Sequence, residues 1–111
     1  MRGRAIRRCH DFSHTPCGQP FLGVFEAVHY WYGNVAVGEN LAWGQGSSGS
    51  ARTMLSSWLA SPEHRQILFR SDWRDLGLSV VKSGSLFGQS NVSVWVAQFG
   101  RHGAVGSVAL P

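Results

Sequence analysis

A single carboxylate, Glu39, lies in an otherwise apolar stretch of the chain, between Val35–Val37 and Leu41–Trp43. A carboxylate in such surroundings is costly to bury unless it is paired or accepts hydrogen bonds. Two histidines flank the stretch in sequence, His14 upstream and His64 downstream. We therefore expect a small polar pocket that holds a metal, runs acid–base chemistry or ties the core together. The residues alone leave open whether Glu39 is functional or only locks the core.

His64 has the more informative local setting of the two histidines. Ser61 followed by Pro62 predicts a helix start, with the serine as N-cap and the proline at the first helical position. His64 then lies in the first turn, where the helix dipole favours neutral imidazole. Neutral imidazole is the form that binds metals or acts as a base. Glu63 is explained by ordinary stabilisation at a helix start, and His14 alone is typical of a surface or capping histidine.

The length of 111 residues predicts one domain with a single core. Hydrophobic residues make up 43% and charged residues 14%, which argues against disorder. The net charge of +4 comes from the start of the chain, where residues 1–8 hold four arginines and no acid. We expect this segment to be a solvated basic tail, and we expect no nucleic-acid partner because no basic face is spread over the fold.

The pattern along the chain predicts helices first and strands later. An initial helix ends near Asp11, and helical spacing or capping signals favour three more helices after it. Alternation of apolar with small or polar residues favours two strands. This order predicts an α+β fold with an antiparallel sheet. The tail from Gly103 to Pro111 gives no firm signal. The expected segments are a helix over 4–11, helices over 20–30, 50–60 and 61–69, a loop over 44–49, strands over 76–80 and 92–97, and a Gly/Ser-rich connection over 82–91.

Cys9 and Cys17 are the only cysteines, and they bracket His14. A local disulfide and two unpaired thiols are both open, whereas the spacing does not match a structural zinc knuckle. No apolar run approaches the roughly 20 residues needed to cross a bilayer. The arginine-rich start is not followed by the apolar region of a secretory signal. The standard zinc-protease, nucleophile-elbow and phosphate-loop motifs are also missing.

Five phrases, in this order, resemble the CAP superfamily or SCP domain in its short bacterial form, the family of cysteine-rich secretory proteins, antigen 5 and pathogenesis-related proteins. The resemblance covers residues 12–100 and implies a three-layer α-β-α sandwich. It implies that residues 1–11 are the remnant of a shortened first helix and that residues 101–111 are a C-terminal tail. The phrases are Phe-Ser-His-Thr, Gly-Glu-Asn-Leu-Ala-Trp-Gly, Trp-Leu-x-Ser-Pro-x-His-Arg, Leu-Gly-Leu-Ser-Val and Val-Trp-Val-Ala-Gln-Phe-Gly.

In the family, two histidines and two acidic residues converge on a cavity that binds zinc or magnesium in some members. His14, Glu39 and His64 match three of these positions, and together they would suffice for a zinc ion with an open coordination position. The fourth position, three residues after Trp58, is Ser61 in this chain. The nearest substitute acid and two further polar neighbours of the cavity are Glu63, Asn40 and Gln98.

The resemblance therefore implies a secreted or envelope binding module, with a small molecule, a lipid or a protein as partner, rather than an enzyme. Trp43, Trp58 and Trp95 are candidates for a groove, although core packing explains them equally simply. A metal-dependent hydrolase using the same His/Glu site is the alternative from another class. A shortened family member without function is a further alternative.

Overall fold

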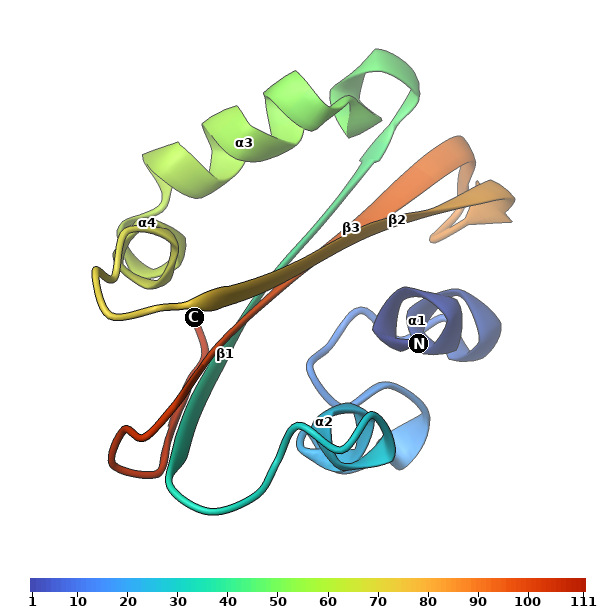
Figure 1. Ribbon diagram of the computed structural model, residues 1–111. Coiled ribbons are helices and arrows are strands. Elements are labelled where there is room, and N and C mark those ends of the chain that lie inside the picture. The colour runs from blue at the N-terminus through green and yellow to red at the C-terminus, as the bar shows by residue number, and fades with distance from the viewer.

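The computed structural model describes residues 1–111 as a four-stranded sheet with helices on both faces (Figure 1). Helices α1 and α2 lie on one face, and α3 and α4 lie on the other. This arrangement confirms the predicted α+β class. The elements in chain order are α1 (Arg2–Cys9), the 3₁₀ turn η1 (Pro16–Gly18), α2 (Gly23–Ala27), β1 (Val35–Gln45), the 3₁₀ turn η2 (Gly46–Gly49), α3 (Ala51–Ala60), α4 (Pro62–Leu68), β2 (Asp75–Leu86), β3 (Gln89–His102) and β4 (Ser107–Ala109).

The strands are ordered β2-β3-β1-β4 across the sheet. Strand β3 pairs antiparallel with both β2 and β1, and these are the two most extensive pairings. Strand β4 pairs parallel with residues 36–38 of β1. The sheet is therefore mixed rather than purely antiparallel as the sequence predicted. The final strand comes from the tail that carried no firm sequence signal.

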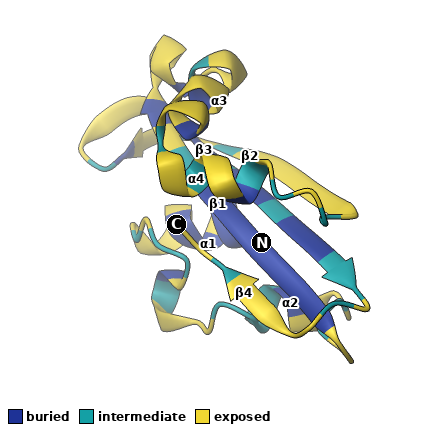
Figure 2. Cartoon of the chain, turned by 90° about the vertical axis from the view of Figure 1, so that its left-hand side faces the viewer, coloured by how far each residue is buried: buried dark blue, intermediate teal, exposed yellow.

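The sheet separates two main hydrophobic cores. Side chains alternate between the faces of a strand, so Leu41 of β1 points towards α1 while its neighbour Ala42 points towards α3. Ile6 of α1 is fully buried in the first core, and Trp58 of α3 is 3% exposed in the second. Strand β1 is buried along most of its length, as Figure 2 shows. The centre of β1 is therefore covered by helices on both sides.

The local helix signals in the middle of the chain are confirmed. Ser50 caps α3 by accepting a hydrogen bond from the Thr53 backbone N–H at 3.2 Å. Helix α4 begins at Pro62 as predicted, but Ser61 does not cap it through its side chain. The Ser61 hydroxyl is instead 2.8 Å from Nδ1 of His64. The expected cap is thus used to orient an imidazole.

Three predicted segments differ from the structure. The basic segment is not a solvated tail, because it forms α1 and buries Arg2 to 3% exposure. The helix expected over 20–30 is the shorter α2. The connection expected over 82–91 is mostly strand, since β2 and β3 are joined only by Phe87 and Gly88, both with positive φ. Positive φ at both central residues is what a tight hairpin turn of this kind requires.

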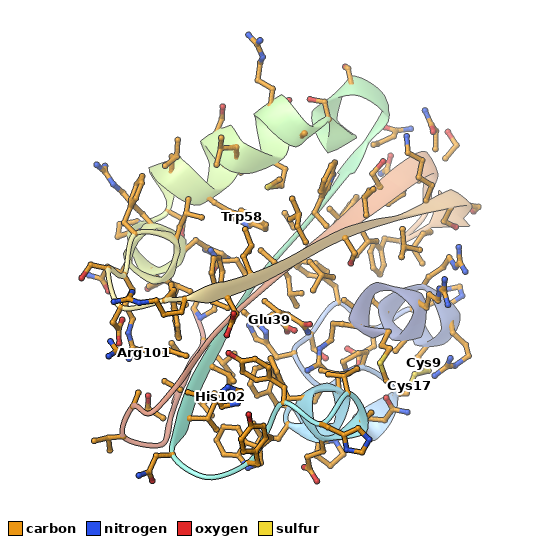
Figure 3. The ribbon with its side chains drawn as sticks, viewed as in Figure 1. Cys9, Cys17, Glu39, Trp58, Arg101 and His102 are labelled. Atoms are coloured by element: carbon orange, nitrogen blue, oxygen red, sulfur yellow. A yellow bond between two sulfur atoms is a disulfide. The ribbon has the colours of Figure 1, made fainter.

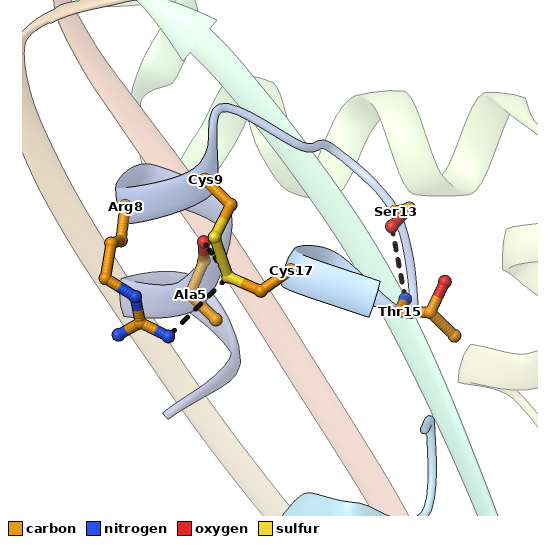
Figure 4. The surroundings of a disulfide bond; sticks show 6 residues. All are labelled: Ala5, Arg8, Cys9, Ser13, Thr15 and Cys17. Atoms are coloured by element: carbon orange, nitrogen blue, oxygen red, sulfur yellow. Dashed lines mark hydrogen bonds between the residues drawn. A yellow bond between two sulfur atoms is a disulfide. The ribbon is translucent and has the colours of Figure 1, made fainter. Parts of the chain in front are cut away.

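Cys9 and Cys17 form a disulfide, with their Cα atoms 5.4 Å apart (Figure 4). The bond ties the end of α1 to η1. It closes the loop that carries His14, and the Arg8 guanidinium lies 3.5 Å from Sγ of Cys17. No helix has the length and apolar character needed to cross a membrane.

Candidate functional site

Glu39, whose side chain is labelled in Figure 3, is the centre of a buried hydrogen-bond network. Its Oε2 atom accepts a hydrogen bond from Nε of Arg2 at 2.9 Å and another from Nε2 of Gln98 at 2.7 Å. Its Oε1 atom lies 2.7 Å from Nδ1 of His14, so an Nδ1–H donor satisfies the carboxylate. We call these four residues the Glu39 network. The sequence correctly predicts a paired carboxylate here, and Arg2 is the partner that it does not reveal.

The fold brings the network together from four separate segments. Glu39 and Gln98 are directly opposite each other in β1 and β3, so their side chains share one face of the sheet. Arg2 reaches the same face from the first turn of α1 and also donates to the Phe21 carbonyl at 2.6 Å. His14 comes from the loop that the disulfide closes. The network therefore fixes α1 and this loop on the sheet.

His64 belongs to a neighbouring but different set of contacts. Asn40 follows Glu39 on β1 and points to the opposite face, where its Nδ2 donates to the His64 carbonyl at 3.0 Å. Burial lowers the pKa of His64, the Glu63 charge opposes this shift, and the charge of His14 adds to it. At neutral pH, His64 is the neutral base expected from its position at a helix start.

The three residues expected to bind a metal are not arranged as one ligand set. Glu39 has both oxygens engaged, and one of them faces a guanidinium. No group of three or more His, Cys, Asp or Glu side chains is placed to hold a metal ion. A carboxylate already neutralised by Arg2 does not fit the role of metal ligand. The Nε2 atoms of His14 and His64, by contrast, make no hydrogen bond within the protein.

The remaining sequence candidates fall in different places. Gln98 is part of the Glu39 network, whereas Glu63 is exposed on α4 and makes no contact with the network. The Oδ1 atom of Asn40 is buried and lacks a hydrogen-bond partner. Such an atom is a position where an interior water is expected.

A groove runs between α2 and the neighbouring strands β2 and β3, on the same face as the Glu39 network. It consists of two adjoining hollows of about 240 Å³ each. Both hollows are lined by Phe25, Val28, Gly77 and Gln98. No atom lies within 4 Å of the place that a Gly77 Cβ would occupy, so the glycine leaves the floor open. We call this feature the α2 groove.

Tyr30 forms one end of the α2 groove. Its hydroxyl donates a hydrogen bond to Oδ2 of Asp75 at 2.6 Å, and burial together with this bond raises the pKa of Tyr30. The ring lies directly against β3 because residue 100 is glycine: a Cβ on Gly100 would overlap it. The position of the Tyr30 ring therefore requires glycine at residue 100 of β3.

The tryptophans expected in a groove do not line this one. Trp58 is buried and donates to the Leu41 carbonyl, Trp95 donates to the Gly49 carbonyl, and Trp43 packs on a phenylalanine ring. The signal that could have located the groove is Gly77, which lies inside β2 between Leu76 and Leu78. A glycine inside a strand often marks a site where another group approaches closely.

Compared with known proteins, the chain matches no family model, no curated protein and no solved structure. Membership of the SCP/CAP family therefore stays a prediction from the sequence phrases.

Proposed function

We propose that this chain is an SCP/CAP-type domain that acts as a binding module, with the α2 groove as its ligand site. The observation that carries this proposal is the position of Gln98. Its side chain lines both hollows of the groove, and its amide nitrogen is held by Glu39. A groove wall fixed by a buried network is preorganised, so little conformational freedom is lost when a ligand binds.

The mostly apolar lining favours an apolar small molecule or lipid over a sugar or nucleotide. Phe25 and Val28 supply apolar walls to both hollows, and Gly77 adds no side chain that would fill the space. Small-molecule sites are typically concave, mainly apolar and provided with a few placed polar groups. In this proposal Glu39, Arg2 and His14 hold the wall in place, and Gln98 is the one member of the Glu39 network that faces the ligand.

We also propose that the protein works outside the cell or in the cell envelope. The disulfide between Cys9 and Cys17 supports this, because disulfides persist mainly in oxidising compartments. In that setting the cross-link keeps the His14 loop closed over Glu39.

Fluorescence titration with the neutral dye N-phenylnaphthylamine tests the groove. We expect saturable binding to the native protein, and loss of most of that binding in Gly77→Val, whose side chain fills the open floor. Gly84→Val is the matched control, because Gly84 lies in the same strand outside the groove with equally open space around it. Equal dye binding by both variants would remove the α2 groove as the ligand site.

A divalent cation held by His14 and His64 is the second candidate function. Nδ1 of His14 contacts Glu39, and Nδ1 of His64 contacts Ser61. Both Nε2 atoms are therefore available to a cation, and this favours the candidate. A carboxylate partner on the far ring nitrogen, as His14 has in Glu39, is usual for a metal-binding histidine. A bound zinc ion would supply a Lewis acid with open positions for water or ligand.

Calorimetric titration with zinc tests the second candidate. Binding should be lost in His14→Ala and in His64→Ala, and kept in the control His29→Ala, which changes an exposed histidine. Zinc binding that survives both changes would exclude the two-imidazole site. Zinc-dependent turnover of esters or peptides, abolished by a chelator, would favour the metal-dependent hydrolase instead.

A further inference from the structure

We propose that the ligand of the α2 groove is an apolar amine that binds in its protonated form, with its ammonium group at Asp75 and its apolar chain over Gly77. This inference rests on the proposed function, since it names the class of ligand for the same groove.

In the hollow at Asp75, the polar side chains offer only hydrogen-bond acceptors to a ligand. The Tyr30 hydroxyl is already donating to Asp75, and the Gln98 amide nitrogen is already donating to Glu39. The groups that remain are Oδ1 of Asp75 and Oε1 of Gln98, neither of which has a hydrogen-bond partner in the protein. An ammonium group has three donors and no acceptor, so it matches this set. A carboxylate placed in this hollow would find no side-chain donor.

Asp75 also keeps its negative charge available. It forms no ion pair with any lysine, arginine or histidine. The guanidinium of the adjacent Arg74 is held elsewhere, because its Nη1 atom donates to the carbonyls of Ser71 and Trp73. Asp75 is an exposed carboxylate without a paired cation, and such a group is an electrostatic match for a cationic ligand.

Aromatic rings flank the same end of the groove. The ring centroids of Phe25 and Tyr30 are 6.3 Å apart, and the ring planes meet at 54°. Both rings line the hollow at Asp75. They therefore supply apolar walls beside the carboxylate.

Beyond Asp75 the groove is lined mainly by apolar side chains, with Met1 and Ser79 also at its second hollow. Its second hollow follows β2 as far as Ser79 and is walled by Val24 and Val96. The four residue steps from Asp75 to Ser79 correspond to about 13 Å of strand. This length accommodates an extended alkyl chain of medium length, with its charged end at Asp75 and its tail under α2.

Calorimetry with three probes of equal chain length tests the inference: octylammonium, octanol and octanoate, all below their micelle concentrations. We expect octylammonium to bind at least about tenfold more tightly than octanol, and octanoate to bind most weakly. Asp75→Asn retains an acceptor for Tyr30 and removes the charge. It should lower the octylammonium affinity roughly tenfold and leave the octanol affinity unchanged.

Asp72→Asn is the matched control, because Asp72 is paired with Arg70 outside the groove. It should leave all three affinities unchanged. Equal affinities for the three probes, or an Asp75→Asn effect that is the same for octanol, would overturn the amine inference while the groove itself stands. Failure of all three probes and of the dye would instead refute the proposed function.

Discussion

Removing the guanidinium of Arg2 should destabilise the fold far more than its place near the start of the chain suggests. The side chain of Arg2 is 2% exposed and that of Glu39 is fully buried, and the two groups are 2.9 Å apart. In Arg2→Met, the carboxylate would stay buried without its cation. Breaking a buried pair in this way costs about 3–5 kcal/mol of unfolding free energy.

That cost is a large share of the roughly 5–15 kcal/mol that stabilises a domain of ordinary size. At roughly 4 °C per kcal/mol for about 100 residues, the melting temperature should fall by about 12–20 °C. Urea unfolding followed by circular dichroism measures the free energy, and a thermal scan measures the shift. Arg4→Met is the matched control, because Arg4 lies in the same helix and is exposed. It should change stability by less than about 0.5 kcal/mol.

A double-mutant cycle separates the ion pair from the packing of the arginine stem. Arg2→Met combined with Glu39→Gln removes both charges, so it should cost less than the sum of the single changes, by up to about 3 kcal/mol. An Arg2→Met variant that loses less than about 1 kcal/mol would refute the reasoning. Strict additivity in the cycle would show that the two charges do not stabilise each other.

Three further outcomes follow from the structure. Ser50→Ala removes the α3 cap and should lower the unfolding free energy by about 1 kcal/mol in urea melts. The ring of His64, followed by NMR titration, should show a pKa below its usual 6.5, and Glu63→Gln should lower it further. Because the folded protein disfavours the imidazolium, this histidine should reduce stability as pH falls below the unfolded-state pKa. Leu78→Lys, on the exposed edge strand β2, should reduce self-association seen by light scattering at high concentration.

Local signals predicted the middle of the chain well. Ser50 and the Ser61-Pro62 pair identified two helix starts, because a cap and a helix-compatible proline act within a few residues. The alternation around Leu78 and Val94 also identified the centres of β2 and β3. The strand ends were missed because Gly/Ser-rich residues carry no apolar alternation, and their pairing depends on the long hairpin that β3 forms with β2.

The longer-range features had no local signal. Strand β1 is covered by helices on both faces, so its residues form a nearly continuous buried stretch instead of an alternating one. The pairing of Arg2 with Glu39 joins positions 37 residues apart, and the arginine-rich segment around it resembles a solvated tail. The sequence did predict that the Glu39 carboxylate, if buried, needs hydrogen-bond or ion-pair partners. The identity of these partners depends on tertiary packing. The position of the groove beside them depends on it as well.

The cross-link between Cys9 and Cys17 makes the surroundings of one carboxylate conditional on the redox state of the solution. His14 sits within the loop that this bond closes, so a thiol reductant releases the constraint that holds the imidazole against Oε1 of Glu39. Arg2 and Gln98 are anchored by a helix and a strand and do not depend on the bond in this way. Reduction should therefore weaken the contact of His14 with Glu39 and leave those of Arg2 and Gln98 in place.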